Sequence, residues 1–150
     1  MSFVDPDDVV EPGAFSACIE MLETNKNLTG AWTNSILIND TGVKIGVNSY
    51  RGMEFTVGNL LRHPTLVHQL VVMRRSAVTP VLPFLAGLTN YAPWVLYVGV
   101  AAQGGFERVT MDGYRWRQHP RGMHLNPDIG KARLMARDAI RRYYESLRQL

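Results

Sequence analysis

Four histidines are the side chains of this 150-residue sequence best suited to bind a metal or move a proton. They form two pairs, His63 with His68 and His119 with His124, and the members of each pair are five residues apart. On a helix that spacing turns the two imidazoles about 140° away from each other, whereas a helical metal pair needs a spacing of four. His63 and His119 also precede prolines, which favours extended or turn backbone. We therefore expect turn or surface histidines and no metal site.

The sequence contains none of the short motifs that frame common active sites. It lacks the phosphate-binding patterns GxxxxGK[ST] and GxGxxG, and it also lacks HExxH, GxSxG and CxxC. Cys18 is the single cysteine, so no internal disulfide can form, and a small apolar helix residue is its simplest role. We therefore expect neither catalysis nor a cofactor. An enzyme is the alternative class.

Basic residues near the C-terminus form a more informative pattern. Arg133, Arg137 and Arg141 are spaced four residues apart, which places them in one row on a helix. Such a row can contact phosphates or an acidic protein surface, or it can solvate the outer face of an ordinary helix. A second cluster interleaves arginines with Trp116, as protein interfaces and nucleic-acid-binding surfaces do.

Charge is distributed unevenly along the chain. Residues 1–30 carry six acids and one base, a net charge of −5, whereas residues 108–150 carry ten bases and four acids, a net charge of +6. Opposite charge at the two ends can steer head-to-tail contact between identical subunits. Two unrelated solvated faces would give the same pattern.

Residues 76–106 contain no charged side chain and are numerous enough to span a bilayer. Three prolines, Pro80, Pro83 and Pro93, interrupt this run, and each removes a helical hydrogen bond that lipid cannot replace. We therefore expect buried strands and loops of a core or of a subunit interface. A membrane-associated subunit remains an alternative. The N-terminus has no basic region followed by an apolar run, so we expect no signal peptide.

Hydrophobic spacing and turn residues predict one α+β domain over residues 1–150. The first element is a helix from about Pro12 to Thr24, with Phe15, Ile19 and Leu22 in one apolar stripe. Residues 35–39 and 43–47 then form a β-hairpin in which Gly42 takes a positive φ. Further along the chain we expect a helix within 58–75 that has Pro64 in its first turn, a strand over 91–100 and a short strand within 106–118.

The last element is a long helix. Asn126, Pro127 and Asp128 are typical of a helix start, and the helix continues from there to Leu150. Its apolar stripe consists of Ala136, Ile140, Tyr143, Leu147 and Leu150. The predicted architecture is an antiparallel sheet with the N-terminal helix and the long C-terminal helix packed on one face.

Three segments, in order, resemble the tail-completion or neck proteins of long-tailed bacteriophages, which are small virion proteins at the head–tail junction. Residues 28–36, LTGAWTNSI, are similar to the family's TGxLxxSI strand; residues 90–99, NYAPWVLYVG, to its YAPYVEFG strand; and residues 119–127, HPRGMHLNP, to its PxxFxxP start of a C-terminal helix. Leu96 stands where the family has an acid, the N-terminal helix is shorter, and residues 58–88 form a larger insertion.

The resemblance implies a subunit of a homo-oligomeric ring, often sixfold or twelvefold, in a virion that assembles in the host cytoplasm. The ring would join the portal or adaptor to the tail tube or terminator. The interface candidates are Tyr91, Trp94 and Tyr97, which lie within the uncharged run, and Trp116 of the basic and aromatic cluster. Arg133, Arg137 and Arg141 would face an adjoining ring or the DNA channel, with transient contact that lacks sequence preference. A non-sequence-specific nucleic-acid-binding module that uses the basic C-terminal helix is the alternative.

Overall fold

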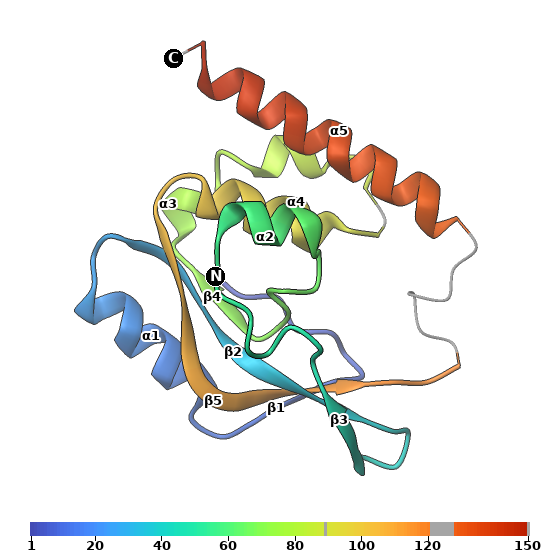
Figure 1. Ribbon diagram of the computed structural model, residues 1–150. Coiled ribbons are helices and arrows are strands. Elements are labelled where there is room, and N and C mark those ends of the chain that lie inside the picture. Colours follow the sequence, from blue (N-terminus) through green and yellow to red (C-terminus); the bar gives the residue numbers. More distant parts are fainter. Residues whose placement is uncertain (89, 121–127, 150) are drawn as a thin grey trace.

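The computed structural model describes residues 1–88, 90–120 and 128–149. Its elements, in chain order, are β1 (Val9–Val10), α1 (Ala14–Thr24), β2 (Leu28–Ile38), β3 (Lys44–Val47), α2 (Val57–Arg62), β4 (Val71–Met73), α3 (Arg75–Val78), the 3-10 helix η1 (Leu82–Leu85), α4 (Ala92–Ala101), β5 (Gly105–Arg117) and α5 (Ile129–Leu147). The fold is α+β and is built on a mixed five-stranded sheet (Figure 1).

The sheet is organised around β2. One side of β2 pairs with β4 near its start and with β3 near its end, while β5 lies along the other side and carries β1 at its outer edge. β2 and β5 are parallel and the other pairs are antiparallel. The expected antiparallel sheet is therefore wrong at its central pair. The long connection through α4 returns the chain to the end of the sheet where β2 begins, so β5 runs in the direction of β2.

The predicted hairpin is confirmed. β2 and β3 pair antiparallel, and Gly42 in the turn has a φ of 84°. Asn39 Oδ1 accepts hydrogen bonds from the backbone N–H groups of Thr41, at 3.1 Å, and Val43, at 2.9 Å. The asparagine side chain thus stabilises the turn that sets the register of the two strands.

α1 is a helix as predicted, but it buries a different stripe. Ala14, Cys18 and Leu22 are buried, whereas Phe15 is 41% and Ile19 49% exposed. The buried stripe has a spacing of four and contains two small residues, so the helix lies close against the sheet.

The expected strand over residues 91–100 is wrong. This segment forms α4, in which every residue from Trp94 to Ala101 is buried. A helix that is apolar on all sides shows neither a period of 3.6 nor one of two, so the pattern alone cannot tell it from a buried strand. Pro93 lies in the first turn, where a missing N–H costs no helical hydrogen bond.

The expected helix within 58–75 is only partly correct. α2 begins after Thr56, whose Oγ1 accepts a hydrogen bond from Asn59 N at 2.9 Å. It ends at Arg62, and Pro64 follows the helix instead of opening it. The proline ring disfavours helical backbone at His63, and the chain then leads into β4.

α5 confirms the long C-terminal helix, and Ala136, Ile140 and Tyr143 of its predicted stripe are buried. Leu147 is 37% exposed, and Leu150 lies outside the described residues, as do Asn126 and Pro127 of the predicted helix start. Among the described helices, none is long and apolar enough to cross a membrane.

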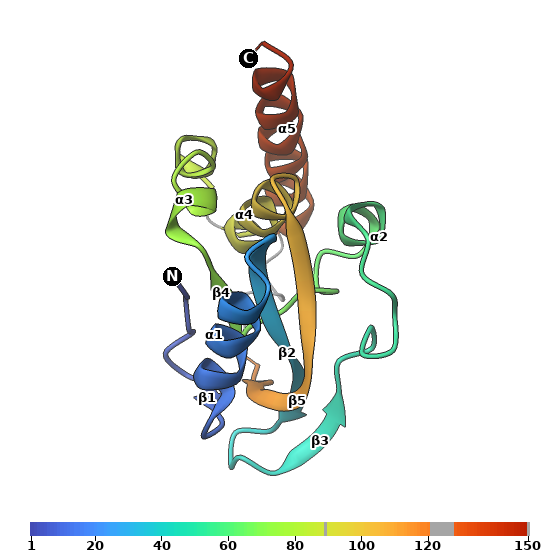
Figure 2. The ribbon, with the colours of Figure 1, turned by 90° about the vertical axis from the view of Figure 1, so that its left-hand side faces the viewer.

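We expected the N-terminal and C-terminal helices to pack on one face of the sheet, and this expectation is wrong. Ala31 and Val72 pack with α1 on one side, whereas Trp32 and Phe106 form a core with α4 on the other. α5 packs outside this layer, on α4 and η1, and does not lie on the sheet (Figure 2). Ala31 and Trp32 are neighbours on β2, so their side chains point to opposite faces of the sheet. Because both faces are apolar there, each is covered by a different helix.

Candidate interaction surface

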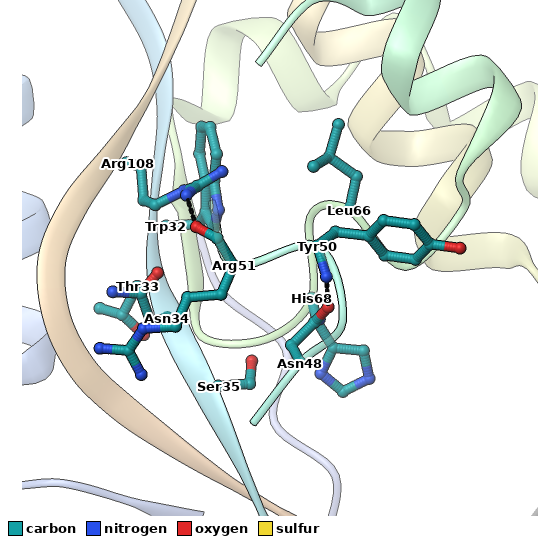
Figure 3. Close-up of a pocket in the computed structure, with 10 residues that line it drawn as sticks. All are labelled: Trp32, Thr33, Asn34, Ser35, Asn48, Tyr50, Arg51, Leu66, His68 and Arg108. Carbon is teal, nitrogen blue, oxygen red and sulfur yellow. Dashed lines mark hydrogen bonds between the residues drawn. The ribbon is translucent and has the colours of Figure 1, made fainter. Parts of the chain in front are cut away.

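A small polar cleft lies between β2 and the loop that follows β3 (Figure 3). Three consecutive buried polar residues of β2, namely Thr33, Asn34 and Ser35, contribute to its lining. Ser35 Oγ donates a hydrogen bond to Gln69 O at 2.8 Å. A buried hydroxyl of this kind needs a partner, and here the partner is the chain's own backbone.

Two arginines hold the loop against the sheet at this cleft. The guanidinium of Arg108 lies 5.5 Å from the ring centroid of Trp32 and donates hydrogen bonds to Met53 O, at 2.5 Å, and to Arg51 O. Arg51 Nη1 in turn forms an ion pair with Asp112 Oδ1 at 2.5 Å. These cations therefore make contacts within the chain, and they stabilise the loop between β3 and α2.

The cleft has the size of a water site. Its volume is about 10 Å³, which is room for roughly one water molecule. Thr33 Oγ1 and His68 Nδ1 are buried and have no hydrogen-bond partner in the described part of the chain. Burial lowers the pKa of His68 to about 4, so its imidazole is neutral at pH 7 and stacks on Trp116 with ring centroids 4.1 Å apart. Small-molecule sites are much larger, about 300–1,000 Å³.

Trp94 and Tyr97, two of the four aromatic interface candidates, lie in the interior of the chain. Each is 2% exposed, and Trp94 Nε1 donates a hydrogen bond to Leu60 O at 2.8 Å. The prediction that these side chains contact another subunit is therefore wrong, because α4 is already covered by the chain's own elements. Within the uncharged run, α4 supplies much of the core of a single molecule, whereas Leu82 in the first half of the run is 43% exposed.

Tyr91 and Trp116, the other two aromatic candidates, are half-buried. Tyr91 precedes α4 with a φ of 63°, and its ring meets that of Trp94 edge-on at 5.8 Å. Trp116 belongs to β5 and packs on His68. Both rings contribute to the chain's own packing, and an interface role for their exposed edges stays a prediction.

The three arginines of the predicted row lie on α5 in different environments. Arg141 pairs with Asp138 at 2.5 Å and with Glu145 at 3.0 Å, so neighbouring acids balance its charge. Arg133 is half-buried, and its Nε is buried without a hydrogen-bond partner among the residues described. Arg137 is exposed and forms no ion pair within that part of the chain. The row therefore presents charge to solvent mainly at Arg137.

The sequence pattern did not show which apolar side chains remain exposed. β3 is an edge strand of the sheet, and Val43, Ile45 and Val47 in and beside it are 59%, 57% and 40% exposed. On α5, Leu134 is 68% exposed. Alternation predicts a strand with one apolar face, but it cannot tell whether the same chain covers that face.

An open groove runs between α1 and the first half of β5. Its volume is about 410 Å³, and its apolar lining consists of Ala17, Met21 and Val109. Glu20 and Glu107 line the same groove; both are exposed, and neither forms an ion pair with a residue that the structure describes. The groove thus combines an apolar floor with two uncompensated acids.

Neither a protein-family model nor a curated protein matches this chain. Within residues 1–88, 90–120 and 128–149, no group of three or more histidine, cysteine, aspartate or glutamate side chains is placed to hold a metal ion. Residues 121–127, which include His124 and most of the third segment that resembles neck proteins, lie outside these ranges. The features that remain for a functional argument are the exposed apolar and charged surfaces.

Proposed function

We propose that this chain is a structural virion protein at the head–tail junction of a long-tailed bacteriophage. It acts as a subunit of a homo-oligomeric neck or tail-completion ring that joins the portal or adaptor to the tail. The three ordered segments that resemble this family support the proposal, and so does the pattern of surfaces that a single molecule leaves uncovered.

The apolar edge strand β3 is the observation that carries the proposal. Val43, Ile45 and Val47 lie in and beside β3 and are all exposed, and the pairing of β3 with β2 shifts by one residue at Ile45. Sheet edges in monomeric proteins are usually blunted by charges, prolines or bulges, because an open edge pairs with other chains. Here the edge carries a register irregularity and one lysine, Lys44, yet three branched apolar side chains in and beside the strand stay exposed. Such a surface suits a subunit that another chain covers after assembly.

The alternative, a nucleic-acid-binding module that uses α5, rests on its exposed cations. Lys131, Arg137 and Arg148 are exposed and form no ion pair with described residues. The ion pairs of Arg141 and of Arg142, which lies 3.1 Å from Asp138, reduce the net charge of the same surface. Binding of unrelated DNA sequences that weakens steeply with salt would favour this alternative.

Light scattering and negative-stain microscopy of the purified chain test the proposal. We expect rings with a central opening, and we expect Ile45→Lys to shift the distribution toward monomers. Lys44→Gln is the matched control, since Lys44 is the exposed neighbour of Ile45 on the same strand and the change adds no charge to an apolar position. In particles of the encoding phage, gold-labelled antibodies are expected at the head–tail junction. A chain that forms no rings and is absent from purified particles would refute the proposal.

A further inference from the structure

The outer face of α5 presents an apolar side chain between two cations. Leu134 is 68% exposed, and Lys131 and Arg137 lie three residues before and after it, on the same side of the helix. The buried side of α5, with Ala136, faces the opposite direction, toward α4. The exposed side therefore presents one large apolar residue flanked by two cations; Asp138, four residues after Leu134, lies on the same side, and Arg141 and Arg142 balance its charge.

The groove between α1 and β5 has the complementary pattern. Its floor is apolar, at Ala17, Met21 and Val109, and Glu20 and Glu107 supply negative charge beside it. The lengths also agree. Residues 131–137 extend about 9 Å along a helix axis, and the part of α1 that lines the groove, residues 17–24, extends about 10 Å.

These two surfaces cannot meet within one molecule. α5 lies beyond α4 at one end of the structure, whereas α1 lies against the face of the sheet opposite α4, in both views (Figures 1 and 2). Contact between them requires a second copy of the chain. Part of the acidic N-terminal region is paired with β5 inside the molecule, as in the ion pair of Arg115 with Glu11, so the positive charge that remains for a neighbouring copy is mainly that of α5.

We propose that α5 of one copy docks in the α1–β5 groove of the next, with Leu134 on the apolar floor and with Lys131 and Arg137 beside Glu20 and Glu107. This mode, in which an amphipathic helix lies in a groove, is a recurrent form of protein recognition. Because the two surfaces differ, the contact is head-to-tail, and its repetition forms a closed ring or a filament. The inference rests on the proposed function, for which it identifies a subunit contact.

Charge reversal tests the docking contact. One variant carries Lys131→Glu and Arg137→Glu, and a second carries Glu20→Arg and Glu107→Arg. Like charges then face each other in each variant alone, and we expect the dissociation constant for self-association to rise roughly tenfold or more. An equimolar mixture restores opposite charges at every contact, so association is expected to return in the mixture.

Single substitutions provide the apolar test and the matched controls. Leu134→Ser is expected to weaken association at all ionic strengths, whereas the ionic part of wild-type association weakens as salt is added. Arg148→Glu, directly after α5, and Glu54→Arg, in the loop between β3 and α2, change charge elsewhere and are expected to leave association unchanged. All these side chains are exposed, and circular dichroism will verify the fold of each variant.

The outcomes separate the docking contact from the proposed function. If the wild type forms rings that none of the α5 or groove substitutions weakens, the docking inference is overturned while the neck-ring proposal stands. A wild-type chain that stays monomeric at high concentration and low ionic strength also overturns the docking inference. Its presence at the head–tail junction of particles would then still support the neck function. Loss of association in each variant and its return in the mixture would support the contact.

Discussion

Replacing Gly30 by alanine should destabilise the protein, because β2 and β5 approach each other closely there. Gly30 pairs with Phe106 across the parallel strands. A Cβ atom at residue 30 would come within 2.8 Å of three carbon atoms of the Phe106 ring. Carbon atoms normally stay about 3.5–4.0 Å apart, so the ring would have to move by about 1 Å or more.

The aromatic ring of Phe106 has little room to move. It is 4% exposed, and its centroid lies 5.3 Å from that of Trp32 and 5.5 Å from that of Phe55. Overpacking of a filled core typically costs about 1–3 kcal/mol, and we expect Gly30→Ala to lie near the upper value. For a chain of this length that loss lowers the melting temperature by roughly 6–12 °C.

Urea unfolding of a double-mutant cycle measures this close approach. Phe106→Leu removes ring atoms next to residue 30, so the double variant should lose less stability than the sum of the two single losses, by about 0.5–3 kcal/mol. Gly130→Ala is the control, since its added Cβ atom would meet nothing within 4 Å and the helix of residue 130 should gain up to about 1 kcal/mol. Wild-type stability of Gly30→Ala, or strict additivity in the cycle, would refute the reasoning.

Three further predictions concern other buried groups. Burial holds the pKa of His68 at about 4, below its ordinary 6.5, so protonation favours the unfolded chain. The free energy of unfolding should therefore decrease by up to about 3 kcal/mol as the pH falls from 6.5 to 4. In His68→Phe this part of the pH dependence should be absent when the free energy of unfolding is measured against pH. Tyr143→Phe deletes the buried hydrogen bond from Tyr143 Oη to Gly99 O, 3.1 Å long, and should cost about 1 kcal/mol in urea unfolding. Burial raises the pKa of the Cys18 thiol to about 11, so an alkylating reagent at neutral pH should modify it slowly in the native protein and rapidly in denaturant.

Each of these predictions has an outcome that would contradict it. An identical pH profile for wild type and His68→Phe would show that this imidazole titrates normally. Tyr143→Phe with unchanged stability would mean that α5 and α4 are not joined through Gly99. Fast alkylation of native Cys18 would place the thiol at the surface, in conflict with its position between α1 and the sheet.

Local chemistry was sufficient to predict several elements of the fold. The hairpin followed from residues 39–42, Asn-Asp-Thr-Gly, because an asparagine side chain bonds nearby backbone and a glycine accepts a positive φ. The long C-terminal helix followed from spacing, since side chains that share a helix face recur every three to four residues. The N-terminal helix was also predicted, but Phe15 and Ile19 of the stripe used to predict it are exposed. In each case the determining interactions join residues that are close in sequence.

Other features depended on which surfaces meet in space. The apolar run of α4 is compatible with strand or helix, and its surroundings on all sides select the helix. Gly30 lies within β2, where the absent Cβ makes room for the ring of Phe106. A residue 76 positions away along the chain therefore determines its role.

For the candidate surface, the sequence by itself determined the inventory: the apolar residues of β3, the cations of the last helix and the acids near the N-terminus. Only the tertiary structure decided which of them face solvent. It buried Trp94 and Tyr97, paired Arg141 with Asp138 and Glu145, and left Leu134 exposed. The physical reason is that exposure and pairing depend on distances between elements, which a linear pattern of hydrophobic and charged residues does not contain.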